Sequence, residues 1–313
     1  MGTPELSQVV LKRLLDFNYN IIAAVTQPDK PKGRGNKLSM SPVKELCLEK
    51  NIPVLQPERV KTDEFYEELC KLNPDMIVVA AYGKILPKRV LDFPKYGCIN
   101  VHTSLLPDYR GAAPIQWAVL NGEKKTGATI MFMDEGCDTG DIITQREIAI
   151  ADDETGGSLH DRLAVLGAEL LTDTLPSVLD QTAVRTPQDH SKMRYFGLIE
   201  KSLGNLDFRR PAKELECYVR GLDPWPGAFT YIDGKLLKIR KAYVIPADEA
   251  KELLTDDNYS DGKPVFGSLS KNNGKSLNFL TGDGILAVTE LQPEGKKCMA
   301  AADYLNGLKG KTK

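Results

Sequence analysis

The chain has 313 residues, of which 42% are hydrophobic and 27% charged, the balance of a folded globular protein. This length is comfortable for about two domains. No apolar run is long enough to span a bilayer, and the first residues lack the basic and apolar regions of a signal peptide. The six cysteines are scattered without a Cys-x-x-Cys pair, so neither a disulfide framework nor a zinc knuckle is indicated. We expect a reducing, cytoplasmic location, with no metal and no membrane partner.

The formal net charge of −2 argues against indiscriminate binding of nucleic acids. The charge is unevenly distributed, because residues 1–200 carry a net charge of −5 and residues 201–313 a net charge of +3. This asymmetry favours an anionic partner for the second part of the chain, although so small an excess is equally compatible with chance.

Helix and strand patterns alternate over residues 1–180, which predicts a doubly wound, mainly parallel α/β sheet. The apolar runs 75–81 and 98–102 are typical of strands that are buried on both faces of a sheet. Other segments have weaker strand patterns (20–26, 52–55 and 128–133) or helix patterns (4–15, 42–50, 62–72 and 158–179).

The pattern changes after residue 180. Residues 181–200 are polar and indicate a linker, and 212–221 is the last predicted helix. Short apolar segments separated by Gly and Pro follow, at 229–232, 236–245, 265–270, 277–281 and 285–291. Many short strands with Gly-rich turns predict a small β-barrel over residues 201–313.

The best candidate site lies at the carboxyl end of the strand 98–102, the end at which open α/β sheets bind ligands. Strand alternation puts Asn100 and His102 on one face, and the Gly-containing loop 134–141 is able to bring Asp138 to them. Such a set suits catalysis without a covalent intermediate, in which the amide and the imidazolium stabilise an oxyanion. The alternative is an ordinary loop histidine near turn-forming aspartates.

A Cys–His–Asp hydrolase is a competing interpretation, since Cys98 and Cys137 lie near His102 and Asp138 in the chain. Cys98 begins an apolar strand, where free cysteines usually pack, and the sequence shows nothing that would activate either thiol. We give this interpretation little weight.

The loop from Gln27 to Lys37 is basic and rich in glycine. Its glycine spacing is not that of a phosphate-binding loop. Beside a site at the same edge of the sheet it would suit a clamp for the end of a nucleic acid, whereas the alternative is a solvated surface loop.

Several segments resemble motifs of the methionyl-tRNA formyltransferases. The most specific is the run from Cys98 to Pro107, with its continuation from Arg110 to Gln116. The other similar segments are spread over nearly the whole chain: residues 1–5, 26–35, 138–141, 223–228, 281–285 and 291–299. Thr103 departs mildly from the family pattern, in which Gly or Ala is frequent at this position.

The resemblance implies a formyltransferase catalytic domain over residues 1–180, a linker over 181–200 and an OB-like tRNA-binding barrel over 201–313. It implies transfer of a formyl group from 10-formyltetrahydrofolate to the α-amine of methionyl-initiator tRNA, without a metal. The implied site residues fall into three groups: catalytic Asn100, His102 and Asp138; folate-binding Ala80, Tyr82, Gly83, Leu86, Ser104, Leu105, Leu106 and Pro107; and tRNA-binding Arg34 and Lys37.

Two other functions stay open at this point. One is a formyltransferase that acts on a sugar-nucleotide amine through the same three residues; the basic loop 30–37 and the tRNA-type barrel count against it. The other is a catalytically silent RNA-binding protein, against which the intact Asn100, His102 and Asp138 count. No amphipathic segment lacks an obvious partner within the chain, so we expect a monomer.

The family's Met-Gly-Thr-Pro turn follows a short apolar strand, and the chain as given begins at this turn. We therefore expect the first, central strand of the sheet to be missing. Its two neighbours, 20–26 and 75–81, would then expose unpaired backbone groups, each at a cost of about 1–3 kcal/mol. The 313-residue form is accordingly expected to be poorly stable or inactive.

Overall fold

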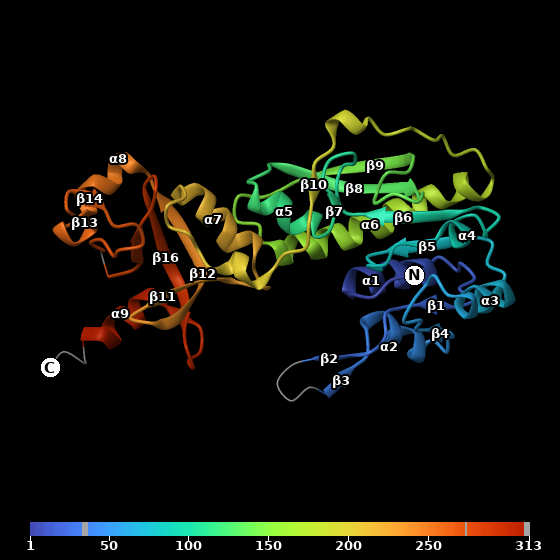
Figure 1. Ribbon diagram of the computed structural model, residues 1–313, viewed down its shortest axis with the longest axis horizontal. Coiled ribbons are helices and arrows are strands. Elements are labelled where there is room, and N and C mark those ends of the chain that lie inside the picture. Colours follow the sequence, from blue (N-terminus) through green and yellow to red (C-terminus); the bar gives the residue numbers. More distant parts are fainter. Residues whose placement is uncertain (33–36, 273, 310–313) are drawn as a thin grey trace. The chain divides into compact units, whose positions relative to one another are not determined.

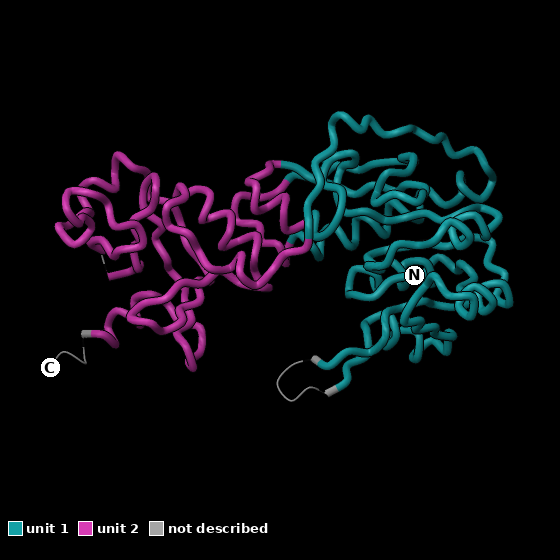
Figure 2. The backbone as a smooth tube through the Cα atoms, in the orientation of Figure 1, with its two compact units in different colours: residues 1–114, 125–149, 159–197 teal, residues 115–124, 150–158, 198–313 magenta. Residues whose placement is uncertain are grey.

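The computed structural model describes residues 1–32, 37–272 and 274–309. The chain divides into two compact units (Figure 2), which are described separately below. The first unit contains residues 1–114, 125–149 and 159–197, and the second contains 115–124, 150–158 and 198–313. Residues 181–197, for which the sequence indicates a linker, thus pack with the first unit.

The main sheet of the first unit has four strands in the order β5–β6–β8–β9 (Figure 1). The strands are β5 (Ile77–Ala80), β6 (Cys98–His102), β8 (Lys125–Phe132) and β9 (Ile142–Ala149). β5 and β6 are parallel, whereas β6–β8 and β8–β9 are antiparallel. The sheet is therefore mixed, and the prediction of a mainly parallel sheet is confirmed only on the β5 side. The short loop after β8 suits the antiparallel pair β8–β9, because a parallel neighbour would need a longer crossover connection.

Two helices of the first unit begin at residues whose side chains cap the first turn. Ser41 accepts a hydrogen bond from the Lys44 amide at the start of α2, and Thr62 accepts one from the Phe65 amide at the start of α3. Asn73 ends α3 in the left-handed conformation that asparagine tolerates. The helices are α1 (Glu5–Asp16), α2 (Pro42–Glu49), α3 (Asp63–Leu72), α4 (Lys88–Leu91) and α6 (Gly156–Leu179).

A second, small parallel sheet pairs β1 (Ala24–Val25) with β4 (Val54–Leu55). Met1 and Gly2 lie between β1 and β5. The Met1 amine donates to the Val78 carbonyl (2.6 Å), the Ala80 amide donates to the Met1 carbonyl (3.0 Å), and the Gly2 amide donates to the Val25 carbonyl (2.9 Å). These two residues thus provide the strand-like pairing between β1 and β5.

Beyond Met1 and Gly2 the space between the same elements is hollow. A cavity of about 150 Å³ is lined by residues of α1, β1 and β5 and by the segment 20–23 that precedes β1. The effect of the expected gap in the sheet on stability stays a prediction.

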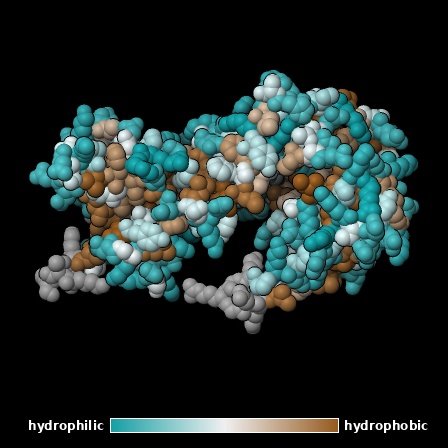
Figure 3. All heavy atoms as spheres, in the orientation of Figure 1, coloured by the Kyte–Doolittle hydropathy of each residue, from teal (hydrophilic) through white to brown (hydrophobic). Residues whose placement is uncertain are grey.

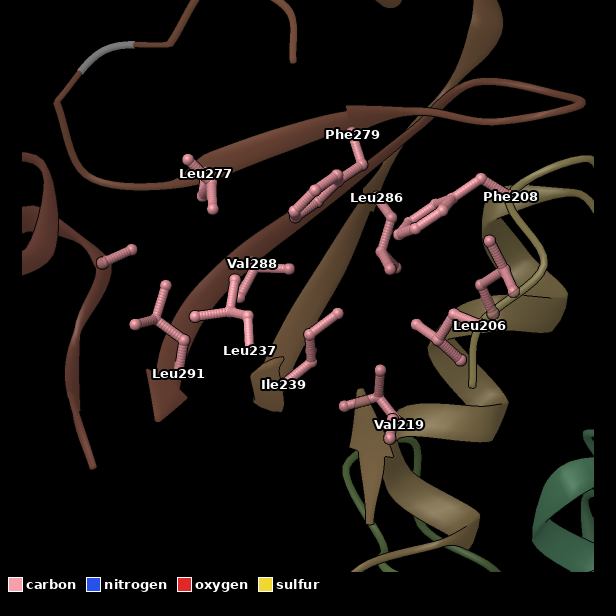
Figure 4. Packing of buried hydrophobic residues seen from close by; sticks show 13 residues of the cluster. Leu206, Phe208, Val219, Leu237, Ile239, Leu277, Phe279, Leu286, Val288 and Leu291 are labelled. Carbon is pink, nitrogen blue, oxygen red and sulfur yellow. The ribbon is translucent and has the colours of Figure 1, made fainter. Parts of the chain in front are cut away.

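The second unit contains a five-stranded antiparallel sheet in the order β11–β12–β16–β15, with β17 paired to β16. A hydrophobic cluster fills the space between this sheet and α7 (Figure 4), and the rings of Phe208 and Phe279 stack within it at 4.9 Å. The elements are α7 (Ala212–Gly221), β11 (Ala228–Ile232), β12 (Lys235–Ile245), β15 (Leu277–Leu280), β16 (Ile285–Pro293) and β17 (Met299–Ala300).

The strand predicted at residues 265–270 is wrong, since this segment forms only an isolated bridge between Leu269 and Phe279. Gly267 has a φ of +85°, a left-handed conformation that interrupts an extended strand. The remaining short elements of the unit are α5 (Pro114–Leu120), α8 (Ala247–Ala250), β13 (Tyr259–Ser260), β14 (Lys263–Pro264) and α9 (Ala301–Lys309).

Candidate active site

The site is built on β6, a strand whose residues are all buried. Asn100 and His102 are only 8% and 6% exposed, so their polar atoms need partners within the protein. β6 is flanked by β5 and β8, with Asn100 opposite Met131 and His102 opposite Thr129 on β8. This neighbourhood fixes the backbone of both residues.

The loop after β8 brings Asp138 to these two side chains. One carboxylate oxygen, Oδ1, lies 3.5 Å from Asn100 Nδ2 and 3.7 Å from His102 Nδ1. The other, Oδ2, accepts a hydrogen bond from the Gly111 amide at 2.9 Å. The contact with His102 is longer than a hydrogen bond, so it is an electrostatic contact across a small gap. The structure thus brings together the three residues predicted to be catalytic.

The backbone of the loop is tightly folded. Asp138 has a φ of +56°, an uncommon value for a residue with a side chain, although one that aspartate tolerates. Gly140 passes so close to β8 that a Cβ atom there would lie 1.9 Å from the Phe132 carbonyl oxygen. Only glycine fits this position, and the close approach turns the chain back toward Asn100 and His102.

The orientation of the His102 ring follows from its second nitrogen. Nε2 lies 2.9 Å from the Tyr109 carbonyl oxygen, which can only accept a hydrogen bond, so Nε2 carries a hydrogen. Nδ1 then faces Asp138 and is the nitrogen that is able to take up or release a proton.

The segment after His102 holds four of the predicted folate-binding residues, Ser104 to Pro107. The Ser104 hydroxyl donates to the Asp108 carbonyl at 2.7 Å, and the side chain is buried. The Leu106 amide donates to the Thr129 hydroxyl at 3.2 Å, and its carbonyl accepts from Gln145 at 2.8 Å. Leu105 and Pro107 are half-buried. The loop is therefore held in one conformation beside the residues predicted to be catalytic.

The other predicted folate residues follow β5, next to β6. Ala80, Tyr82 and Leu86 turn their side chains into the core, and burial raises the pKa of Tyr82 to about 12. Gly83 is exposed and has a φ of +74°. A ligand at this edge would therefore meet the backbone of the segment, and the folate assignment of these residues stays a prediction.

One of the predicted tRNA contacts, Lys37, begins β3 (Lys37–Ser39), which pairs with β2 (Lys30–Lys32). Arg34 lies outside the described residues, and of Lys37 only the backbone is described, as the first residue of β3. Lys30 bonds to the side chain of Gln27 at 2.9 Å.

The thiols near the site are poorly suited to be nucleophiles. Burial raises the pKa of Cys98 to about 12, and burial together with the adjacent Asp138 raises the pKa of Cys137 to about 11. Both groups are therefore protonated at neutral pH, which counts against a Cys–His–Asp hydrolase. Within the described part of the chain, no group of three or more His, Cys, Asp or Glu side chains is placed to hold a metal ion.

Two polar residues at the site were not predicted from the sequence, Arg110 and Gln188. Gln188 reaches the loop of Asp138 and is held by Arg110. Arg110 lies within the conspicuous motif 98–116, but Gln188 lies in a polar stretch that carries no motif. Only the fold brings the two together across the intervening chain.

Helices long and apolar enough to cross a membrane are not found in the ranges 1–32, 37–272 and 274–309.

Solved structures with the same fold include the N-formyltransferase from Helicobacter canadensis in complex with folinic acid and dTDP-3-aminofucose. It has a TM-score of 0.63 and 18% sequence identity, over 92% of this chain and 96% of that protein. A sugar 3N-formyl transferase, solved with dTDP and 5-N-formyl-THF, has a TM-score of 0.65 and 18% identity, over 95% of this chain and 97% of that protein. At this identity the likeness establishes the fold alone.

Two family models match the chain: "Formyl transferase" over residues 1–175 and "Formyl transferase, C-terminal domain" over residues 198–309. The methionyl-tRNA formyltransferase of Caldanaerobacter subterraneus subsp. tengcongensis is 48% identical, over 98% of this chain and 95% of its own length. That of Clostridioides difficile is 45% identical over the same shares of both chains. The chain therefore belongs to the methionyl-tRNA formyltransferase family.

Proposed function

We propose that the chain transfers the formyl group of 10-formyltetrahydrofolate to the α-amine of methionyl-initiator tRNA, with Asn100, His102 and Asp138 as its catalytic residues. The observation that carries the proposal is the meeting of these three side chains at the end of β6, in a chain with 45–48% identity to methionyl-tRNA formyltransferases. The formyl donor is the second substrate, and formylmethionyl-tRNA for the initiation of translation is the product.

The reaction needs stabilisation of an oxyanion. The neutral α-amine attacks the formyl carbon, a C–N bond forms, and the carbonyl electron pair moves to oxygen. The Nδ2–H of Asn100 and the positive charge of protonated His102 favour this oxyanion over the neutral carbonyl. Collapse breaks the bond to the folate nitrogen, which takes a proton, while the attacking amine loses one toward Asp138, directly or through water.

Asp138 has two roles in this scheme. Its Oδ1 faces both Asn100 and His102, so one negative charge orients the amide and supports the imidazolium. Its Oδ2 is occupied by the Gly111 amide, which keeps the carboxylate from rotating away. The Nε2–H of His102 is committed to the Tyr109 carbonyl. The proton of the imidazolium that is available to substrate is therefore the one on Nδ1.

The formyl donor would lie along the backbone of the segment 80–86 and the loop 104–107. These segments follow the neighbouring strands β5 and β6, so they meet at the same edge of the sheet. The loop 104–107 is fixed by bonds to Thr129 and Gln145, which is the preorganisation that a substrate-binding loop requires.

The second unit would contribute binding of the tRNA. Its antiparallel sheet is compatible with the OB-like barrel that we propose, and residues 201–313, which form most of the unit, carry a net charge of +3. Figure 3 shows hydrophilic residues over much of the visible face of this unit, interrupted by hydrophobic patches. The positive net charge of residues 201–313 supports contact with a polyanion.

A cytoplasmic location and a monomeric state complete the proposal. All six cysteines are free, as expected for a protein in a reducing compartment. The monomer rests on the sequence pattern, in which every amphipathic segment finds a partner within the chain. Sedimentation of the protein at micromolar concentration tests the state directly, and a stable dimer would contradict it.

A substrate comparison separates this function from its rivals. The protein is incubated with 10-formyltetrahydrofolate and, in parallel, with methionyl-initiator tRNA or an amino-sugar nucleotide. We expect formylation of the tRNA only. Formylation of the sugar nucleotide alone would make the chain a sugar formyltransferase, the function printed for one solved structure with the same fold at 18% identity. Binding of tRNA without any transfer would indicate a silent RNA-binding protein.

A further inference from the structure

We propose that Gln188 is a positioning residue, which holds the loop of Asp138 in its catalytic geometry and is itself fixed by Arg110. The inference rests on the proposed function, because it assigns Asp138 a role in the reaction. Residues 184–197 lie within the stretch 181–200 that the sequence indicates is a linker. The proposal gives these residues a part in assembling the active site.

Gln188 is buried, with 6% of its surface exposed, and its side-chain amide bridges two segments. Nε2 donates to the Asp138 carbonyl at 3.0 Å and to the Gly140 carbonyl at 2.7 Å. Both hydrogens of the amide are thus directed at the loop. Since Asp138 has a left-handed backbone, these two bonds hold the loop in a conformation that a short peptide would leave readily.

Arg110 fixes the other end of the same amide. Its Nε and Nη2 lie 3.1 and 2.6 Å from Gln188 Oε1, and its Nη1 lies 3.1 Å from His190 Nδ1. The guanidinium is only 3% exposed, and burial of a charge is costly unless it is hydrogen-bonded. A cation at Oε1 also polarises the amide, which strengthens the bonds that Nε2 donates to the loop.

A strand pair ties the same segment to His102. β10 (Tyr195–Phe196) pairs in parallel with β7 (Arg110–Gly111), and the rings of Phe196 and Tyr109 stack at 4.7 Å. The neighbours of Arg110 are the groups that hold the catalytic pair: the Tyr109 carbonyl accepts from His102, and the Gly111 amide donates to Asp138. Residues 188–196 therefore support both partners of the His102–Asp138 contact.

The substitution Gln188→Glu is the sharpest test, because it separates positioning from folding. The carboxylate still accepts from Arg110, and as a charged partner it strengthens this contact. It has no hydrogen to donate, however, and it faces two carbonyl oxygens. We expect the variant to stay folded while kcat falls about 10–100-fold, since small displacements of catalytic groups have effects of this size. KM for both substrates should change less than about twofold, because the bonds to substrate are not touched.

Gln188→Ala and Lys192→Ala provide the comparison. Gln188→Ala should lower kcat like Gln188→Glu and also lower the melting temperature, because it leaves Arg110 buried without its amide partner. Lys192 lies in the same segment, and its side chain is 75% exposed. Lys192→Ala should leave kcat, KM and the melting temperature unchanged. The pH profile of kcat should shift in both Gln188 variants and not in Lys192→Ala, because only they displace the carboxylate that faces His102.

Amide hydrogen exchange of the free protein decides the structural step without any substrate. The peptide covering residues 134–141 should exchange faster in Gln188→Glu than in the wild type. Wild-type exchange in this peptide, or a wild-type kcat in an active Gln188→Glu enzyme, would overturn the proposal. Failure of the wild type to formylate methionyl-tRNA would instead overturn the proposed function, and the exchange comparison would still decide whether Gln188 holds the loop.

Discussion

The proposed mechanism depends on Asn100, whose side-chain amide supplies an uncharged hydrogen-bond donor beside the charged donor His102. Its bond to Asp138 is long, at 3.5 Å, and a weak bond of this length can be exchanged for a stronger one to a developing oxyanion. The stabilisation by the Asn100 amide is therefore expected in the transition state rather than in the complex with substrate.

Asn100→Ala should lower kcat by about 10²–10³, the usual cost of removing one oxyanion donor. KM for the formyl donor should stay close to the wild-type value. Steady-state kinetics with varied 10-formyltetrahydrofolate measures both constants. An increase of KM at unchanged kcat would show that Asn100 binds substrate equally in its ground and transition states, contrary to the proposed role.

At the scale of elements, local sequence predicted those whose pattern is self-contained. β6 and α7 have the bounds that the apolar pattern predicts, because one is buried on both faces and the other carries a clear amphipathic repeat. β9 was missed since its residues are half-buried or exposed and form no apolar run. β10 has only two residues and exists through its pairing with β7, distant in the chain. Sequence patterns therefore predicted the three side chains that meet at the end of β6, but not the segment that supports them.

The β2–β3 hairpin is the element to which the tRNA contact is assigned. Replacing Arg34 and Lys37 by Ala should weaken the use of tRNA, and the slope of log KM against log salt should become less steep by up to about 0.7–0.9 per lost phosphate contact. KM for the folate should stay unchanged. The check is a salt series of formylation rates. Unchanged activity on tRNA at moderate salt would mean that the hairpin is only a surface feature.

At the scale of the whole molecule, the link between the two sheets of the first unit is the unusual feature. Met1 and Gly2 join β1 and β5, and a cavity of about 150 Å³ lies beside them. Cavities cost stability because the lining atoms lose packing contacts. Burial also lowers the pKa of the Met1 amine from 8.0 to about 6, so the folded state disfavours its charged form.

This shift makes stability depend on pH in a defined window. The unfolded chain binds a proton at Met1 below about pH 8, and the folded chain only below about pH 6, so the unfolding free energy falls as the pH drops between these values. The expected loss is roughly 2–3 kcal/mol. Urea denaturation at pH 6 and pH 8 measures it. Acetylation of Met1 should reduce this difference in unfolding free energy between pH 6 and pH 8, because an amide does not titrate. If the acetylated and the unacetylated protein show the same pH dependence, the effect belongs to other groups.

The most direct test of the central claim is single-turnover formyl transfer by His102→Ala, measured together with binding of the formyl donor. We expect the variant to lose most of the transfer rate while its affinity for 10-formyltetrahydrofolate stays close to that of the wild type, because His102 supplies positive charge to the transition state. Retention of the wild-type transfer rate, or a loss explained by weaker binding alone, would contradict it.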